Sequence, residues 1–556
     1  MTNARPLRAL RDDIVAHRLE LLGYAAILVL AAVLRLGNLA VRGTWDADQG
    51  HDMLVLRALV LDGRWPLLGP PTSIGDFHHG VLYYLLLAPA AVASRADPVA
   101  LTTWIALAGI AAVAVTGWLA RSIGGPIAGL IAALLLAVSA SAGAESIFIW
   151  NPNLIALSSS VALAAAWHAW RGGRARWWVI AGGAAVVTMQ FHVLGVILTP
   201  VIGGLMVDDV RRRRRRGDQE GAGAVLRAAL GWIALAVLSY VPLAIHEIGS
   251  NASELRAAIA FLNGGGGPAS VALPARLPII GLRVVGWPLT GLITAAPAAS
   301  IVAVAVTVSL ALWRGWIWRG TPASSERLAV RWLALGLVWT VGALAVGAAS
   351  LATVVDGLPN DHYHAFADPL VVVLVAVGLA GLLTRGSGVV PSGAVPPGRG
   401  GLGAMGAAAV LVALVGWNLA NQPPGRAADG GWSAAQAAAI RVIAAGDGPL
   451  VLSSLPTFKS DEALRMPLLA DGVEVAPAGV NGASFADPTT TRIILCDQLF
   501  RPAIGADCGG PAEDAWLANP ASGLPLAAAS QGVSTGPTLL DRFEAAPGRW
   551  ISVYRP

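Results

Sequence analysis

The chain has little charge, almost no lysine and few cysteines. Only 13% of its 556 residues are charged, whereas 55% are hydrophobic, and this balance excludes an ordinary soluble globular protein. Lys459 is the single lysine, so arginine supplies nearly all the positive charge. The two cysteines, Cys496 and Cys508, permit one disulfide if they lie outside the cytoplasm. We expect no cleavable signal peptide, because the start is polar and basic and the apolar run after it is long enough to remain as an anchor.

The positive charge is unevenly distributed along the chain. Residues 425–556 hold 9 basic and 13 acidic residues, a net charge of −4, so residues 1–424 carry +9 and the whole chain +5. The excess lies in short loops, where arginine orients membrane helices by remaining on the cytoplasmic side. We therefore interpret the six arginines at 211–216 as a cytoplasmic loop, and we expect no nucleic-acid partner.

Apolar stretches of about 20 residues predict eleven membrane-spanning helices. The arginine-rich loops then place the N-terminus in the cytoplasm and the C-terminus outside a cytoplasmic membrane. Residues 80–93 are apolar but short, so we interpret them as a juxtamembrane or re-entrant helix. A full span there would put residues 211–216 outside. The predicted spans are 20–41, 99–119, 126–142, 154–170, 177–191, 193–208, 225–245, 289–312, 330–352, 366–384 and 402–420.

The last part of the chain, residues 425–556, is less apolar and contains no predicted span. Residues 432–445 have a helical pattern, and short apolar runs bounded by turn residues predict strands at 448–454, 472–478, 491–498 and 549–555. We predict a membrane domain over 1–424 and a small soluble extracytoplasmic α/β domain over 425–556.

Acidic and histidine residues gather on the predicted outer side of the membrane. Asp46, Asp48 and Asp52 lie within seven residues of the first outer loop. A carboxylate at a low-dielectric interface can act as a general base toward a hydroxyl, although acids also accumulate in outer loops without any function. Further candidates in the outer loops are His78, His79, Glu145, Asn151, Asn153, His192, Arg276, Arg283, His362, Tyr363 and His364.

Three of these loops carry a family resemblance. The segments TWDADQGHD (44–52) and GVLYYLLLAP (80–89), IWNPN (149–153) and DHYHAFADP (361–369) resemble outer loops of the GT-C glycosyltransferases, in the branch of aminoarabinose transferases and protein O-mannosyltransferases. The resemblance covers about residues 1–425. It implies an all-α polytopic membrane bundle with about eleven transmembrane helices and juxtamembrane helices in the first outer loop. It also implies a sugar donor carried on polyprenyl phosphate.

By this resemblance, Asp48 matches the catalytic aspartate that deprotonates the acceptor hydroxyl as it attacks the anomeric carbon with inversion. The other candidates would bind substrate, and Arg276, Arg283, His362 and His364 would face the lipid phosphate. For the two arginines, interfacial snorkelling is an equal alternative. Asp48 with Glu145 is a candidate site for Mg²⁺ or Mn²⁺. The commoner pattern has Glu where this chain has Gln49, which weakens the case for a metal.

The acceptor implied by the resemblance is a glycan, a glycolipid or a protein. A transporter or flippase of lipid-linked sugars is the main alternative, since charges within membranes also mark transport paths. Transporters usually place such charges near the midplane, within repeats, whereas here they gather on one side and no strong repeat is evident. A third alternative is a cell-envelope scaffold whose outer domain binds carbohydrate.

Overall fold

The structure is a computed structural model of the chain. It describes residues 17–72, 77–261, 263, 271–317, 324–353, 361–386, 399–446, 449–456, 461–477, 490–518 and 537–555.

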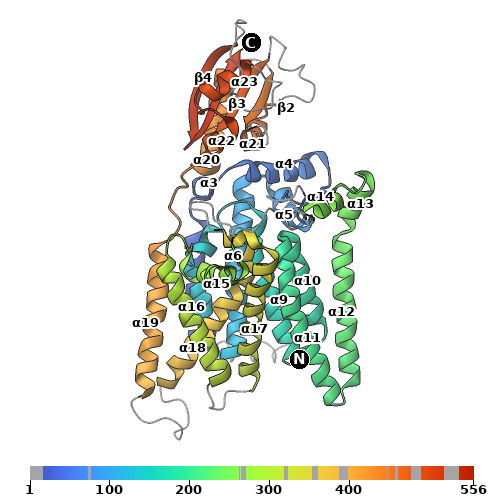
Figure 1. Ribbon diagram of the computed structural model, residues 1–556, viewed down its shortest axis with the longest axis vertical. Helices are drawn as coiled ribbons and strands as arrows, with labels where there is room; N and C mark the ends of the chain where they lie inside the picture. Colours follow the sequence, from blue (N-terminus) through green and yellow to red (C-terminus); the bar gives the residue numbers. More distant parts are fainter. Residues whose placement is uncertain are drawn as a thin grey trace, which may run out of the picture.

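Long helices form the membrane part, and each predicted span overlaps with one of them (Figure 1). Within the described residues, eight helices are long and apolar enough to cross a membrane, while α7, α9 and α10 are shorter. The chain is therefore a multi-pass membrane protein. The helices are α2 (Arg18–Leu36), α6 (Pro98–Gly124), α7 (Pro126–Val138), α9 (Ile155–Trp170), α10 (Arg176–Phe191), α11 (Leu198–Arg215), α12 (Gln219–Ser239), α16 (Pro297–Leu312), α17 (Ser324–Gly347), α18 (Asp368–Gly386) and α19 (Arg399–Ala420).

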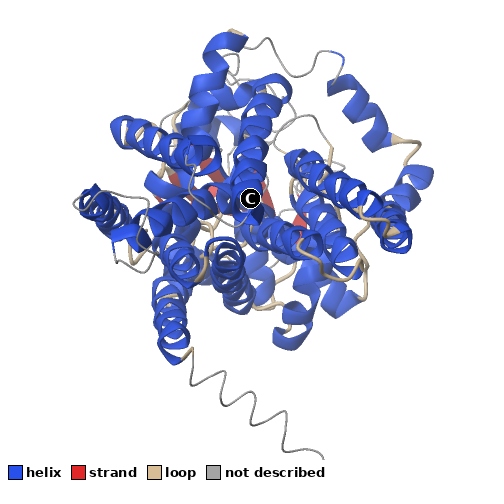
Figure 2. Ribbon diagram, turned by 90° about the horizontal axis from the view of Figure 1, so that it is seen from below, coloured by secondary structure: helices blue, strands red, loops and turns tan. Residues whose placement is uncertain are grey.

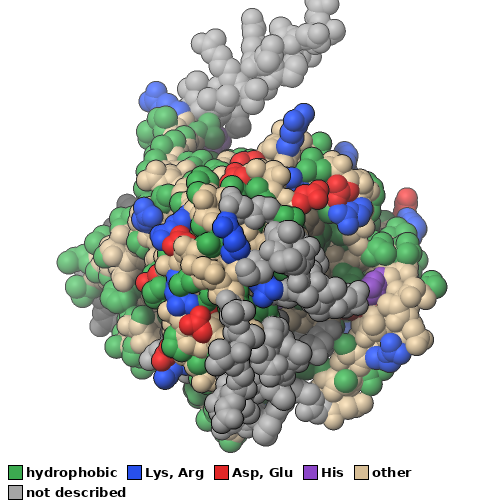
Figure 3. Space-filling model, turned by 90° about the horizontal axis from the view of Figure 1, so that it is seen from above, with side chains coloured by type: hydrophobic (Ala, Val, Ile, Leu, Met, Phe, Trp, Pro, Cys, Tyr) green, Lys and Arg blue, Asp and Glu red, His purple; other side chains and the backbone are tan. Residues whose placement is uncertain are grey.

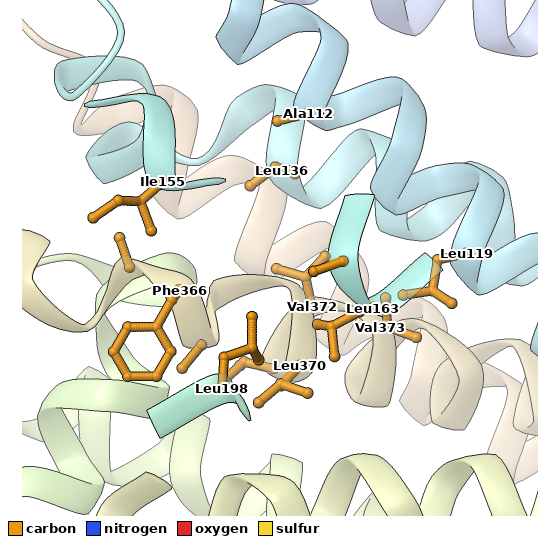
Figure 4. Close-up of a cluster of buried hydrophobic side chains, with 14 of the residues drawn as sticks. Ala112, Leu119, Leu136, Ile155, Leu163, Leu198, Phe366, Leu370, Val372 and Val373 are labelled. Atoms are coloured by element: carbon orange, nitrogen blue, oxygen red, sulfur yellow. The ribbon is translucent and has the colours of Figure 1, made fainter. Parts of the chain in front are cut away.

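Helix α18 forms the centre of the bundle. Its apolar residues Leu370, Val372 and Val373 are fully buried and lie among side chains of α6, α9 and α11 (Figure 4). The hydrophobic effect does not hold helices together in lipid, so close packing through small residues replaces it. Gly124 of α6 is an instance, because a Cβ atom there would lie 2.9 Å from Ala128 of α7.

Shorter helices cover one end of the bundle, where α4 (Ala47–Asp62) lies across the helix ends (Figure 1). Residues 80–93 were predicted to form a short helix, and α5 (Leu82–Ser94) occupies them. No helix was predicted between the spans 225–245 and 289–312, where we expected an outer loop over 247–285, and this was wrong in part. That segment contains the end of α13 (Val241–Gly249), α14 (Ser253–Ala260) and most of α15 (Leu273–Thr290).

Helix α15 is inserted into the bundle, since its second half is buried against α16, α17 and α18. The predicted span 289–312 therefore begins later, at Pro297. Pro278 and Pro288 lie inside α15, and proline within a segment argues against a helix there.

The C-terminal domain stands beyond the same end of the bundle as α4 (Figure 1). The four predicted strands correspond to β1 (Leu450–Leu455), β2 (Val475–Pro477), β3 (Thr491–Asp497) and β5 (Arg549–Arg555). The strand β4 (Thr538–Ala546) was missed. The sheet order is β2-β1-β3-β5-β4, with β1 parallel to β2 and β3, and with β5 antiparallel to β3 and β4.

The C-terminal domain also contains the helices α20 (Gly431–Ala445), α21 (Glu462–Ala470) and α23 (Pro511–Ala518). Cys496 forms a disulfide with Cys508. Seen along the long axis, the sheet lies behind the helices of the bundle (Figure 2). From the opposite end, described side chains of both charges are interspersed over the domain (Figure 3), as expected of a surface in water. The chain passes from α19 to α20 over residues 421–430, so the boundary at 424 stays a prediction.

Candidate active site

A cavity of about 340 Å³ opens beneath α4, at the end of the bundle that faces the C-terminal domain. Its walls come from α4, from the loop before α5 and from four short 3₁₀ helices: η1 (Asn151–Leu154), η2 (Val193–Ile197), η5 (Ala349–Ala352) and η6 (Asp361–Ala367). Segments far apart in the sequence thus meet in one place. The polar and aromatic side chains that line the cavity are Asp48, His51, Asp52, Thr72, Phe77, His79, Trp150, Asn151, His192, Ser350, Phe261, Tyr363 and Glu462.

The first turn of α4 holds Asp48 at the cavity. Asp46 is the N-cap, and its carboxylate accepts a hydrogen bond from the backbone N–H of Ala47 at 2.7 Å. Gln49 completes a capping box by accepting from the N–H of Asp46 at 2.9 Å. Asp46 therefore sets the start of the helix and is not among the cavity-lining residues, while Asp48 is exposed toward the cavity.

The buried side chain of Gln49 makes a hydrogen bond that a glutamate could not make. Its Nε2 donates to the carbonyl oxygen of Ile149 at 2.9 Å, which links the first outer loop to the second. A carboxylate at this position has no proton to donate and would face that carbonyl oxygen without compensation.

Asp52 lies one turn after Asp48 and is buried. Its two oxygens accept hydrogen bonds from the hydroxyls of Tyr83 and Tyr84, each at 2.8 Å. Burial raises the pKa of Asp52 to about 7, although both tyrosine hydrogen bonds oppose that rise. The carboxylate thus anchors α4 to α5. Asp52 also lines the cavity, so its predicted contact with substrate stays a prediction.

A row of aromatic and imidazole rings lies along the cavity, where Trp150, Tyr363, His192 and His79 line it and His362 does not. Trp150 lies 4.1 Å from His362 between ring centroids, His362 lies 4.0 Å from Tyr363, Tyr363 lies 4.6 Å from His192, and His192 lies 5.0 Å from His79. Burial lowers the pKa of His79 to about 4 and that of His192 well below its usual value, and a neighbouring imidazole adds to each effect. Both rings are therefore neutral at pH 7 and offer stacking and hydrogen bonds without charge.

The two asparagines of the second outer loop each donate a hydrogen bond to a backbone carbonyl oxygen. Asn151 donates to the carbonyl oxygen of Phe191, and Asn153 donates to that of Phe148 at 2.8 Å. Only Asn151 also lines the cavity. His78, at the edge of the first loop, binds Glu254 of α14 through its backbone N–H at 2.7 Å and through Nδ1 at 3.0 Å.

A second polar cluster lies behind the cavity wall. The guanidinium of Arg283 forms a buried bidentate pair with Asp361, at 2.9 and 2.7 Å, and Nε2 of His364 lies 3.1 Å from the same carboxylate. None of these three residues lines the cavity. The prediction that Arg283 and His364 face a lipid phosphate is therefore not supported by their positions, because Asp361 already occupies both.

Glu145 lies near this second cluster and does not line the cavity. Burial raises the pKa of Glu145 to about 8, and the charge of Asp361 adds to the rise. Asp48 and Glu145 therefore do not share the cavity as the predicted metal pair would require. Among the described residues, no group of three or more His, Cys, Asp or Glu side chains is arranged to hold a metal ion.

Arg276 does not line the cavity but binds a segment next to it. It donates from Nε to the carbonyl oxygen of Val271 at 2.6 Å and from Nη1 to that of Ala345 at 3.2 Å. Ala345 precedes the cavity-lining Gly347 by two residues. No arginine or lysine lines the described part of the cavity itself.

The sequence did not reveal that the C-terminal domain reaches this site. Glu462, the first residue of α21, lines the cavity, and its Oε1 lies 3.0 Å from Nδ1 of His51. The two residues are 411 positions apart, and nothing in either local pattern links them.

No protein-family model matches the chain, and no curated protein sequence does. Among solved structures, ArnT from Cupriavidus metallidurans bound to undecaprenyl phosphate aligns with a TM-score of 0.55 at 13% identity, over 97% of this chain and 98% of that one. The apo state of the same protein aligns with a TM-score of 0.54 at 14% identity and with the same coverage. The oligosaccharyltransferase AglB from Archaeoglobus fulgidus aligns with a TM-score of 0.48 at 12% identity, over 89% of this chain and 71% of that one.

Proposed function

We propose that this chain, whose fold is the GT-C fold of ArnT, is an integral-membrane glycosyltransferase. It would move a sugar from a polyprenyl-phosphate carrier to an acceptor hydroxyl. The observation that carries this proposal is the position of Asp48, an exposed carboxylate that faces a cavity walled by aromatic and neutral imidazole rings. Such rings present flat faces on which a sugar can stack.

Asp48 is the proposed general base. Its carboxylate takes the proton of the acceptor hydroxyl as that oxygen attacks the anomeric carbon of the donor sugar. The bond between the anomeric carbon and the phosphate oxygen breaks, and the polyprenyl phosphate leaves with the bonding electrons. Attack from the face opposite the phosphate inverts the anomeric configuration. The capping box and the Gln49 hydrogen bond fix the helix turn on which this carboxylate is mounted.

The departing phosphate needs hydrogen-bond donors or positive charge. The N–H groups of His79 and His192 are the proposed donors within the cavity, and Arg276 is the proposed cation next to it. The proposed mechanism assigns no step to Mg²⁺ or Mn²⁺, because Glu145 does not line the cavity that Asp48 lines.

We further propose that the cavity opens on the outer side of the cytoplasmic membrane, with the N-terminus inside and the C-terminal domain outside. Helix α11 ends in Arg211–Arg215 at the end of the bundle opposite α4 (Figure 1), and arginine remains on the cytoplasmic side. The acceptor would then be a glycan, a glycolipid or a protein of the cell envelope, and membrane lipids would surround the bundle.

The proposal is tested with purified protein in detergent. Undecaprenyl phosphate carrying [¹⁴C]glucose, [¹⁴C]mannose or [¹⁴C]arabinose is the donor, and an extract of membranes supplies acceptors. We expect one donor to lose its label to an acceptor and to yield undecaprenyl phosphate, with the product anomer inverted. A pure transporter would transfer nothing in detergent and would move the labelled lipid across proteoliposomes, and that pair of results would refute the proposal.

A further inference from the structure

The C-terminal domain is docked directly on the helix that bears Asp48. Arg549 of β5 binds the carboxylate of Asp46 at 2.7 Å and the carbonyl oxygen of Trp45 at 2.9 Å. The indole N–H of Trp45 donates to the carbonyl oxygen of Ala463 at 2.8 Å, and Arg57 donates to that of Leu469 at 3.1 Å. The docking therefore uses several contacts outside the cavity.

The backbones of α4 and α21 approach so closely that no side chain fits between them. A Cβ atom at Gly50 would lie 2.2 Å from the carbonyl oxygen of Glu462. This approach fixes where α21 begins, and its first residue is the one that reaches the cavity.

Glu462 and His51 line the cavity together with Asp48. His51 follows Asp48 by three residues, so both side chains lie on one face of α4. The side chains of His51 and Glu462 are 31% and 23% exposed, and the ion-pair distance between them is 3.0 Å. Burial lowers the pKa of His51, but Glu462, with Asp52 and Asp48, more than offsets this effect and leaves the pKa above its usual value.

We propose that Glu462 is an acceptor-binding residue that the C-terminal domain supplies to the active site. Its carboxylate accepts a hydrogen bond from a second hydroxyl of the acceptor, and His51 holds that carboxylate in place. The reacting hydroxyl is thereby positioned against Asp48. This inference rests on the proposed glycosyl transfer.

The same residues indicate the class of acceptor. Asp48 and Glu462 bring two carboxylates to one side of the cavity, and no arginine or lysine lines its described part. An acceptor carrying phosphate or carboxylate near the reacting hydroxyl would be repelled. A neutral compound with several hydroxyls, such as a glycan, satisfies both carboxylates by charge-assisted hydrogen bonds.

The test compares Glu462→Gln with two control variants. Asp461→Asn removes the same charge one residue earlier, where the carboxylate binds Arg465 at 3.0 Å and does not line the cavity. Arg57→Gln weakens docking without touching the cavity. For each variant, transfer from the labelled donor is measured against the concentration of the membrane extract, and transfer to water is measured without the extract.

We expect Glu462→Gln to raise the apparent KM for the extract by roughly tenfold or more, as for the loss of a hydrogen bond to a charged group. Transfer to water should remain within about twofold of the wild type, because donor and base are intact. Asp461→Asn and Arg57→Gln should behave like the wild type, and the labelled product should pass through an anion exchanger.

An unchanged apparent KM in Glu462→Gln overturns the inference. A raised apparent KM in Arg57→Gln also overturns it, since weaker docking alone would then explain the effect. An anionic product overturns the assignment of acceptor class. These failures are distinct from failure of the proposed function, in which the wild type itself transfers no label from any donor and both proposals fall.

Discussion

Gly50→Ala tests whether the C-terminal domain docks as the structure describes. In an isolated helix this change stabilises by about 1 kcal/mol, because alanine is the better helix former. Here the new Cβ atom would lie 2.2 Å from the oxygen and 2.4 Å from the carbon of the Glu462 carbonyl. Both contacts are with backbone, so α21 must move by roughly 1 Å or more to restore a normal separation.

Such a shift stretches the three contacts between α4 or its N-terminal flank and α21, at 2.8, 3.0 and 3.1 Å, toward the limit of a hydrogen bond. At about 1 kcal/mol for the neutral Trp45 bond and about 2 kcal/mol for each of the two bonds that involve a charged group, docking weakens by up to about 5 kcal/mol. Hydrogen exchange of the α4 and α21 amides should therefore accelerate, while exchange in the membrane helices should not.

Gly425→Ala is the matched control, because the space around Gly425 is open and exchange should be unchanged. Wild-type or slower exchange in Gly50→Ala would refute the reasoning, since the helix propensity of alanine would then act alone.

Three further changes have defined outcomes. Gln49→Glu should destabilise the protein by about 3 kcal/mol, because a buried carboxylate would face the carbonyl of Ile149; thermal denaturation in detergent measures this, and an unchanged melting temperature would contradict it. Asp361→Asn should lower the free energy of unfolding by about 3–5 kcal/mol, because it leaves the buried charge of Arg283 unpaired. The double variant Asp361→Leu with Arg283→Met should lose less stability. Equal losses in the two variants would argue that the ion pair is not the cause. Because the pKa of Asp52 is raised to about 7, its contribution to stability is fully present below its unfolded pKa and is lost as the pH rises through about 7. The melting temperature should thus fall between about pH 4 and about pH 7 and level off above that, and Asp52→Asn should flatten that fall; an identical slope in the variant would exclude Asp52 as its source.

Much of the fold was predictable because the membrane imposes length and composition on each span. Long apolar runs were enough to locate the membrane helices, and short apolar runs between turn residues were enough to locate β1, β2, β3 and β5. The strand β4 was missed because Asp541, Arg542 and Glu544 interrupt its apolar pattern. Helix α15 was missed because Pro278 and Pro288 lie inside it, and proline within a segment argues against a helix.

The candidate site was predictable in part, for a similar reason. Loops on one side of a membrane must share a surface, so the convergence of Asp48, His79, Asn151 and His192 followed from topology alone. Which of the charged groups pair with each other did not follow. The sequence offered Arg283 as a phosphate ligand, whereas the inserted α15 brings it against Asp361.

Contacts between the domains were beyond reach of the sequence. Gly50 belonged to a motif of the first loop, but a side chain is excluded there by the backbone of Glu462, which lies far along the chain. Local periodicity carries no information about such a pair, because neither helix changes its pattern to accommodate the other.

The central claim is that Asp48 is the base of a sugar transfer from a polyprenyl-phosphate carrier. Its most direct test is a single-turnover measurement with the donor that the wild type uses, for the wild type and Asp48→Asn. We expect the variant to bind undecaprenyl phosphate with an unchanged Kd and to transfer the sugar about 10²–10⁴-fold more slowly. Transfer by Asp48→Asn at the wild-type rate would contradict the account.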